Sequence, residues 1–213
     1  FNVFYSIPRF KITLALYLGL TGESLKGQDV YNAGIATHFV SSEKLTELEN
    51  NLSKCASDNE VIFLLNKFNE PPKDNSLSLS VRDIDYCFSA STIEDIIARL
   101  ETVQNDWSAK TLERLHKMSP GSLKISLRAL QRGAQLERYQ RLQMENRLVV
   151  HSIDNHDFPE GVRALLIDKD NKPQWNPRTL AEVNDEYIES FFKRLPDDKE
   201  LKLDPYTPVP SVY

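Results

Sequence analysis

The stretch LTGESLKGQDVYNAGIATHFV, residues 20–40, decides the fold of this chain. Gly22 follows an apolar run, and glycine is common at the position directly after the end of a helix. Asp29 is a candidate N-cap for a short helix that Gly34 closes. Residues 35–40 then predict a strand. We therefore expect a helix end, a turn, a short helix and a strand in this order.

Composition describes an ordinary globular protein of 213 residues, 40% hydrophobic and 27% charged. A formal net charge of −5 argues against a dedicated nucleic-acid surface. Cys55 and Cys87 have no C-x-x-C pair or Cys/His spacing beside them, so neither a metal site nor a disulfide framework is predicted. No apolar run reaches a transmembrane length, and we expect no membrane partner.

Apolar residues at helical spacing predict a mostly α chain from Phe10 onward. The segment from Ile12 to Leu20 is apolar on nearly every side, which indicates a buried helix. The polar stretch from Glu70 to Ser76 contains two prolines and predicts a loop. Further helices are expected to begin near Ser41, Glu60, Ser91 or Thr92, Ser119, Gln135 and Asp157.

Two of these helix starts carry specific signals. Ser119 is placed to cap a helix whose first residue is Pro120, and Gly133 is placed to close it. Asp157 and Glu160 have the spacing of a capping box, in its Asp variant. After that box we expect four apolar residues to pack inward: Phe158, Val162, Leu165 and Leu166.

Several polar residues could carry chemistry, and each has a structural alternative. For His38 and His156 we favour a structural or solvated histidine over an acid/base group. Ser119 and Ser122 lack the G-x-S-x-G context of a nucleophile, so a helix-cap function is favoured.

Capping likewise explains Asp157 and Glu160 more simply than a pair of hydrolytic carboxylates does. Arg138 and Arg141 could meet a phosphate, but a solvated helix face is the simpler interpretation. No catalytic residue and no metal ligand set is therefore assigned within this chain.

Five stretches resemble, in order, the 3-hydroxyisobutyryl-CoA hydrolases of the crotonase (enoyl-CoA hydratase/isomerase) superfamily. The first lies in the opening stretch, as Leu25–Gly27, Asp29–Tyr31 and Ala33–Phe39. The others are Cys87–Ile97, Met118–Arg128, His156–Asp170, and the pair Pro173 and Trp175. One such match is a weak signal, whereas several in family order are specific.

The resemblance implies that the chain is mostly α and forms the C-terminal helical part of an α/β crotonase-like fold, a ββα spiral. Residues 1–40 would then be the end of the crotonase-like core, 41–195 a C-terminal helical region, and 196–213 an extended, proline-containing tail. The catalytic Glu/Asp pair and the oxyanion-hole glycines would lie before Phe1, so the missing N-terminal half of the fold is an expected partner.

The resemblance also implies a function: hydrolysis of an acyl-CoA thioester in valine catabolism, in mitochondria and without a cofactor. Lys169, at a helix end between Asp168 and Asp170, could then lie near the phosphates of CoA; a solvated helix end is the structural alternative. A homo-oligomer is a further possible partner. The alternative function is a crotonase-fold scaffold in the small subunit of the mitochondrial ribosome, and a generic helical interaction module comes third.

Overall fold

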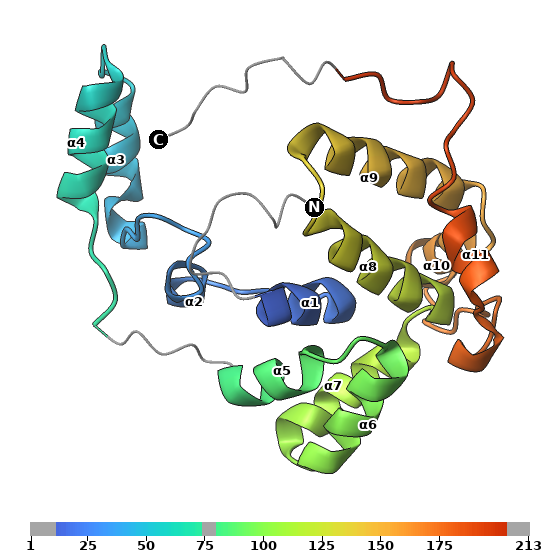
Figure 1. Cartoon of the computed structure of the whole chain (residues 1–213). Helices are drawn as coiled ribbons and strands as arrows, with labels where there is room; N and C mark the ends of the chain where they lie inside the picture. The colour runs from blue at the N-terminus through green and yellow to red at the C-terminus, as the bar shows by residue number, and fades with distance from the viewer. Residues whose placement is uncertain (1–11, 74–79, 204–213) are drawn as a thin grey trace. The chain divides into compact units, whose positions relative to one another are not determined.

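A computed structural model describes residues 12–73 and 80–203 (Figure 1). These residues form helices and connecting loops and include no β-strand, which confirms a mostly α chain. The predictions for residues 1–11, for the end of the 70–76 loop and for the tail beyond residue 203 lie outside the described part. By their contacts the residues fall into two compact units, 1–18 with 22–85 (unit 1) and 19–21 with 86–213 (unit 2). The predicted boundaries at 40 and 195 stay predictions.

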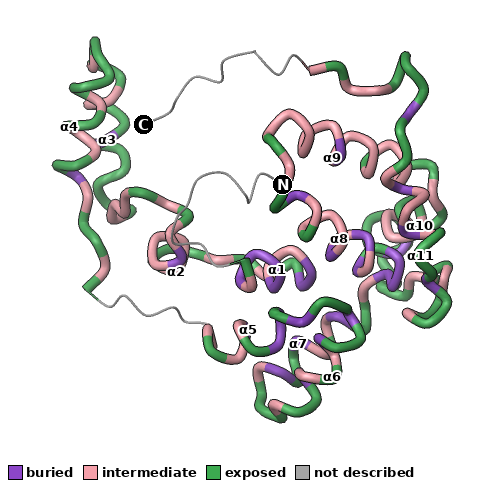
Figure 2. The backbone as a smooth tube through the Cα atoms, viewed as in Figure 1, coloured by how far each residue is buried: buried purple, intermediate pink, exposed green. Residues whose placement is uncertain are grey.

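Unit 1 contains most of the predicted buried helix, α1 (Ile12–Thr21), whose last turn belongs to unit 2. Most of the side chains of α1 are buried, including Leu14 and Tyr17 at 5% and 3% exposure, which confirms the prediction (Figure 2). Gly22 follows the helix with a φ of 65°, in the left-handed region that glycine adopts without strain. The helix end expected there is confirmed.

The next two predictions are wrong in part. Helix α2 (Gln28–Asn32) is capped by the backbone of Gly27, so Asp29 is its second residue and not its N-cap. Gly34 does close this helix, with a φ of 77°. Residues 35–40 form no strand because their backbone groups bond elsewhere: the Ile35 amide donates to the Val30 carbonyl at 3.0 Å, and the Phe39 amide donates to the Asn69 side chain at 2.9 Å. They form a connecting loop.

The rest of unit 1 contains a helical hairpin. A 3-10 turn, η1 (Ser42–Lys44), leads into α3 (Leu45–Leu52), and α4 (Asp58–Phe68) packs against α3. The helix expected from Ser41 is present, although the Ser41 side chain makes no capping bond. Ser57 caps α4 by accepting a bond from the Glu60 amide.

Helix α5 is Val81–Phe88. Its residues up to Asp85 belong to unit 1, and its residues from Tyr86 onward belong to unit 2. Thr92 caps α6 (Ile93–Val103) by accepting a bond from the Asp95 amide. Its buried face is made by Ile93, Ile96 and Leu100, which are at most 1% exposed. Helix α7 (Asp106–Lys117) packs against α6.

Helix α8 (Pro120–Gly133) lies at the centre of the contacts in unit 2, touching α6, α9, α11 and the 3-10 turn η3 (Leu180–Glu182). Its start is as predicted: the Ser119 side chain accepts a bond from the Ser122 amide at 3.0 Å, and Pro120 is the first helical residue. Helix α9 (Arg138–Ile153) begins three residues later than expected. Helix α11 (Asp185–Ser190) forms an apolar cluster with α8 and the residues that flank α11. The cluster is made of Ile125, Val183, Ile188 and Phe191.

The helix expected to begin near Asp157 is present, but several details predicted for it are wrong. Asp157 is the first residue of α10 (Asp157–Val162) rather than its cap, and no capping box forms there. Helix α10 continues into a π-helical turn, η2 (Arg163–Ile167), in which the Asp168 amide bonds to the Arg163 carbonyl five residues back. A π-turn adds a residue to the helical repeat and moves the following side chains to another face. Leu165 and Leu166, which lie in this turn and were predicted to pack inward, are 58% and 68% exposed. Phe158, which lies before the turn, is 53% exposed and so also does not pack inward, whereas Val162 is partly buried.

Candidate functional site

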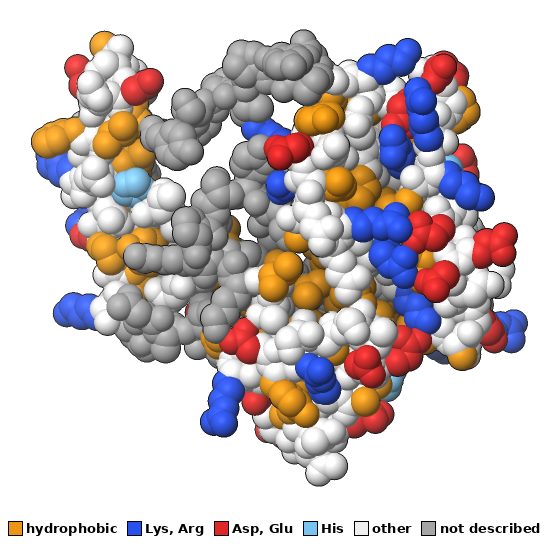
Figure 3. Space-filling view, viewed as in Figure 1, with side chains coloured by type: hydrophobic (Ala, Val, Ile, Leu, Met, Phe, Trp, Pro, Cys, Tyr) orange, Lys and Arg blue, Asp and Glu red, His pale blue; other side chains and the backbone are white. Residues whose placement is uncertain are grey.

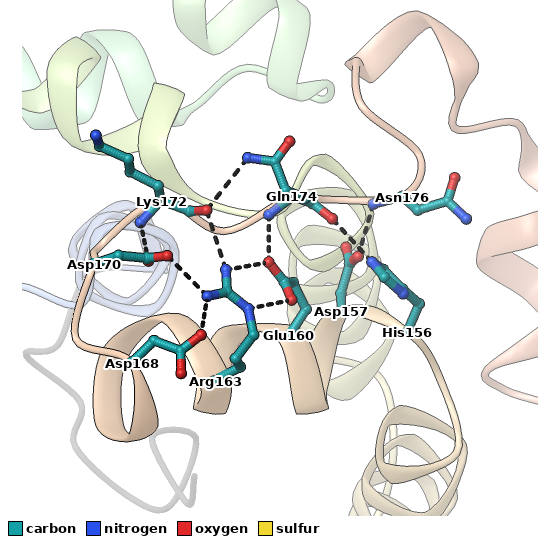
Figure 4. A network of polar contacts seen from close by, with 9 residues as sticks. All are labelled: His156, Asp157, Glu160, Arg163, Asp168, Asp170, Lys172, Gln174 and Asn176. Atoms are coloured by element: carbon teal, nitrogen blue, oxygen red, sulfur yellow. Dashed lines mark hydrogen bonds and ion pairs between the residues drawn. The ribbon is translucent and has the colours of Figure 1, made fainter.

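The polar residues that sequence analysis singled out near the C-terminus lie together in unit 2, on α10, η2 and the loop that follows (Figure 4). They form two adjacent arrangements. One surrounds Asp157 and borders a cavity. The other is centred on Arg163, and we call Arg163 with Glu160, Asp168 and Asp170 the Arg163 cluster.

The cavity has a volume of about 880 Å³, within the range of pockets that take small organic ligands. Both polar and apolar side chains line it. The lining includes Ser119, Asp157, Phe158, Trp175, Tyr187 and Phe191.

Asp157 joins three segments at the side of this cavity. Its Oδ2 accepts a bond from the Ser119 hydroxyl at 2.5 Å. Its Oδ1 accepts one from the Asn176 amide at 2.8 Å (Figure 4). Asp157 is 7% exposed and Ser119 is 5% exposed. Because both carboxylate oxygens and the hydroxyl are engaged in bonds that connect the start of α8, the start of α10 and the loop, this pair is a structural connection.

A second polar contact lies on the same cavity. The Tyr187 hydroxyl donates to Asn155 Oδ1 at 3.4 Å. Burial, together with the charge of Asp157, raises the pKa of Tyr187 above its ordinary value of 10.0. Tyr187 is therefore a neutral hydrogen-bond donor at physiological pH.

Arg163 binds three carboxylates at once. It forms a two-bond fork with Glu160, with Nε–Oε2 and Nη2–Oε1 distances of 2.9 and 2.8 Å. Its Nη1 donates to Asp168 at 2.6 Å and to Asp170 at 2.8 Å, and its Nη2 also reaches the Lys172 carbonyl at 3.3 Å (Figure 4). Fork geometry of this kind is the strongest that an arginine offers to a carboxylate.

The cluster lowers the pKa of two of its acids, Glu160 and Asp170. Bonds from Arg163, and then from the Gln174 amide, lower the pKa of Glu160 from 4.5 to about 2. Arg163 and the Lys172 amide likewise lower the pKa of Asp170. Glu160 and Asp170 are therefore ionised at physiological pH, and both accept bonds from the guanidinium.

The loop held by the cluster, residues 168–172, is called here the lysine loop. Lys169 and Asn171 have φ values of 56° and 54°, so the loop makes two left-handed bends. The Asn171 amide bonds to the Ala164 carbonyl at 3.0 Å, and the Lys172 amide bonds to Asp170 Oδ1 at 2.8 Å. Beyond the loop, the Gln174 amide donates to Glu160 at 2.7 Å.

Lys169, the one binding residue that the sequence suggested, lies at the exposed tip of this loop. Within residues 12–73 and 80–203, no carboxylate forms an ion pair with Lys169 or Lys172. Both acids beside Lys169 bind Arg163 instead. The two ammonium groups are thus exposed cations on a loop whose acids are already paired.

The other candidates lie elsewhere or have local partners. His38, in unit 1, contacts Thr37 and the Asn66 side chain at 2.9 and 3.2 Å. His156 contacts the Gln174 carbonyl at 2.9 Å, so it helps to hold the loop after η2 (Figure 4). Arg141 donates to the Leu136 carbonyl at 2.7 Å. These bonds fit the structural interpretation favoured for them.

Arg163 was missed by the analysis of candidate residues. A signal was present, because Glu160 lies three residues before it at helical ion-pair spacing. Asp168 and Asp170 follow within seven residues, but only the π-turn and the bends after it bring both back to one guanidinium.

No group of His, Cys, Asp and Glu side chains that could hold a metal ion occurs among the described residues. None of the helices in that part of the chain is long and apolar enough to span a membrane. On the face drawn in Figure 3, acidic and basic side chains are intermixed, without a broad patch of one sign.

A family model described as enoyl-CoA hydratase/isomerase matches residues 2–192. The mitochondrial 3-hydroxyisobutyryl-CoA hydrolase of Danio rerio is 41% identical over 206 residues, which are 93% of this chain and 54% of that protein. The Homo sapiens protein of the same name is 44% identical over 198 residues, 90% of this chain and 51% of that protein. The chain therefore spans about half the length of the curated relatives it matches.

Solved structures give the same result for the fold. A carnitinyl-CoA dehydratase from Mycobacterium thermoresistibile has a TM-score of 0.77 and 31% identity, over 89% of this chain and 53% of that one. An enoyl-CoA hydratase from Rhodobacter sphaeroides has a TM-score of 0.74 and 29% identity, over 89% and 54%. The expected crotonase-like fold is confirmed, and nothing in these matches favours the ribosomal scaffold.

Proposed function

Because the chain belongs to the enoyl-CoA hydratase/isomerase family, we propose that the complete protein hydrolyses the thioester of 3-hydroxyisobutyryl-CoA. The observation that carries this proposal is the 41–44% identity to relatives named for that reaction, sustained over at least 90% of the chain. The structures with hydratase and dehydratase names are less similar, at 29–31% identity. The hydrolases are therefore the better guide to the reaction.

In the proposed reaction, water adds to the thioester carbonyl and the carbon–sulfur bond breaks. The products are 3-hydroxyisobutyrate and the free thiol of CoA. We assign the catalytic carboxylates and the oxyanion donors to a half of the fold that precedes Phe1, since the polar groups of Ser119 and Asp157 are engaged in structural bonds. No metal or organic cofactor takes part in this scheme.

The relatives' names also support a mitochondrial location for the complete protein. We propose that its catalytic half packs on the exposed apolar side chains of α10 and η2. These are Phe158, Leu165, Leu166 and Ile167, each more than half exposed in this chain. An apolar row of this kind commonly marks an interface. A homo-oligomer remains a further prediction.

Lys169 is the proposed contact to the phosphates of CoA. Its ammonium group is exposed and, among the described residues, is joined to no carboxylate. Lysine is a common ligand of phosphate because it offers a compact positive charge. The contact would be equal in the ground state and the transition state, so it would act on KM and not on kcat.

The reaction is tested by release of the CoA thiol. The full-length protein is expected to liberate free thiol from 3-hydroxyisobutyryl-CoA and to leave crotonyl-CoA unhydrated. Rapid hydration of crotonyl-CoA without thiol release would place the protein with the hydratases and contradict the proposal. The two readouts separate because hydration leaves the thioester intact.

The Lys169 contact is tested by Lys169→Ala. Loss of one charge-assisted contact of about 1 kcal/mol should raise KM for the CoA thioester roughly fivefold, with kcat unchanged. KM for the pantetheine thioester, which lacks the nucleotide, should not change. Lys110→Ala, at an exposed lysine on α7, is the control and should alter neither value. An unchanged KM for the CoA thioester in Lys169→Ala would contradict the phosphate contact and favour the alternative interpretation, in which Lys169 is a solvated residue at a helix end.

A further inference from the structure

The Arg163 cluster concentrates several charges in a short stretch of sequence. Three carboxylates, from Glu160, Asp168 and Asp170, converge on one guanidinium, and all four residues lie within eleven positions of sequence. Lys169 and Lys172 lie on the same loop without carboxylate partners in the described part of the chain. Asp168 and Asp170, the acids nearest to Lys169 in sequence, thus form ion pairs with Arg163 and not with the two lysines.

Removing the guanidinium would have two consequences for the lysine loop. Asp168 and Asp170 would become free to pair with Lys169 and Lys172, because opposite charges close in sequence attract one another once the guanidinium no longer holds the carboxylates. The balance of charge would also change, from three cations and three anions to two cations and three anions. Both changes would make the loop a poorer site for an anionic ligand.

The guanidinium also sets the shape of the loop. It holds Asp168 and Asp170 on either side of Lys169, whose own φ is 56°. It contacts the Lys172 carbonyl at 3.3 Å, while Asp170 in turn accepts the Lys172 amide at 2.8 Å. Arg163 therefore fixes the backbone that carries both ammonium groups (Figure 4). A lysine at position 163 has neither the fork geometry nor enough reach for these partners together.

We propose that Arg163 is a positioning residue for the phosphate-bearing end of the ligand. By holding Glu160, Asp168 and Asp170, it keeps Lys169 and Lys172 unpaired and in one arrangement, ready for the phosphates of CoA. This inference rests on the proposed function and adds to it a second phosphate contact, Lys172, and the residue that organises both.

The test is direct binding of CoA and of pantetheine to the full-length protein by titration calorimetry. Arg163→Met should weaken CoA binding about fivefold to tenfold, as much as loss of a phosphate contact does, and leave pantetheine binding unchanged. Lys172→Ala should have a similar, nucleotide-specific effect. Arg163→Lys keeps the charge but not the geometry, so it should recover less than half of the loss in binding free energy.

Arg128→Met is the matched control. Arg128 also binds two carboxylates, those of Asp185 and Glu189, but it lies on α8 and has no loop lysines to organise. Its loss should leave the affinity for CoA unchanged. Weakening of CoA and pantetheine alike by Arg163→Met, or full recovery in Arg163→Lys, would overturn the positioning role.

These results are separate from the test of the reaction. A protein that binds CoA with this dependence on Arg163 but releases no thiol would contradict the proposed hydrolysis and support the positioning role. If the protein hydrolyses its substrate but the wild type and Arg163→Met bind CoA with equal affinity, the proposed hydrolysis is supported and the positioning role is contradicted. Failure of the wild-type protein to bind CoA would overturn the inference.

Discussion

The Arg163 cluster differs from a second group of arginine–carboxylate pairs in unit 2, here called the Arg128 cluster. In the latter, Arg128 binds Asp185 at 2.9 Å and Glu189 at 2.5 Å, and Arg132 binds both Glu189 oxygens at 2.6 and 2.7 Å. These partners are separated by 57 to 61 residues in sequence. In the Arg163 cluster the separations are three to seven residues.

This difference in separation indicates different uses of the same chemistry. The Arg128 cluster connects α8 to α11, and the Arg132 guanidinium also lies 4.4 Å from the centre of the Phe192 ring. Its bonds are lost only when the two segments separate. The Arg163 cluster encloses one loop, so its bonds can be lost while the rest of unit 2 stays folded. We therefore expect the first cluster to affect stability and the second to affect ligand binding.

The largest effect on stability is expected for Glu189→Ala. Glu189 accepts bonds from two arginines, and charged hydrogen bonds contribute about 1.5–3 kcal/mol each when well formed. Because Glu189 is 39% exposed, a total loss of about 1–2 kcal/mol is more realistic. Urea unfolding should show this loss, with KM for the CoA thioester unchanged. If Glu189→Ala were as stable as wild type, the claim that the Arg128 cluster stabilises the fold would be contradicted.

A smaller, local effect is expected for Arg163→Met. The amides of Lys172 and Gln174 donate to Asp170 and Glu160, two carboxylates that Arg163 holds in place. Hydrogen exchange at these amides should accelerate on the order of tenfold, because the loop opens without global unfolding. Exchange in α6 should not change. Equal acceleration in α6 would show that the cluster supports the whole unit.

The smallest effect is a change in the pH dependence of stability near Glu160. The folded-state pKa of Glu160, about 2, lies below its ordinary value of 4.5. The ionised carboxylate is thus favoured by folding, and its contribution is complete above about pH 4.5 and is lost as the pH falls toward 2. The difference in unfolding free energy between wild type and Glu160→Gln should therefore shrink over this interval. A constant difference across the interval would contradict the lowered pKa.

Much of the fold could be predicted from local sequence signals. Local sequence predicts the conformation at Ser119, which precedes Pro120, and at Gly22, which follows an apolar run. This is possible because capping and a left-handed φ depend on the residue and its neighbours. Residues 35–40 were predicted wrongly because a strand needs a partner strand, and the described residues of unit 1 provide loop and side-chain acceptors instead. The sequence of one segment does not show which distant groups will accept its backbone hydrogen bonds.

The candidate site shows the same limit. Lys169 could be suggested from its place at a helix end together with the family resemblance. The Asp157 capping box was wrong because Ser119 and Asn176, distant in sequence, take up its carboxylate. The exposure of Leu165 and Leu166 depends on the π-turn, which adds one residue to a helix whose spacing otherwise predicts burial.

The most direct test is a double-mutant cycle between Arg163 and Lys169, read out as CoA affinity of the full-length protein. If Arg163 acts by presenting the lysine loop, Lys169→Ala should weaken CoA binding less in the Arg163→Met background than in wild type. The coupling should be absent with pantetheine and absent when Arg128→Met replaces Arg163→Met. Strictly additive losses for Arg163→Met and Lys169→Ala would show that the two residues act independently and would contradict the account.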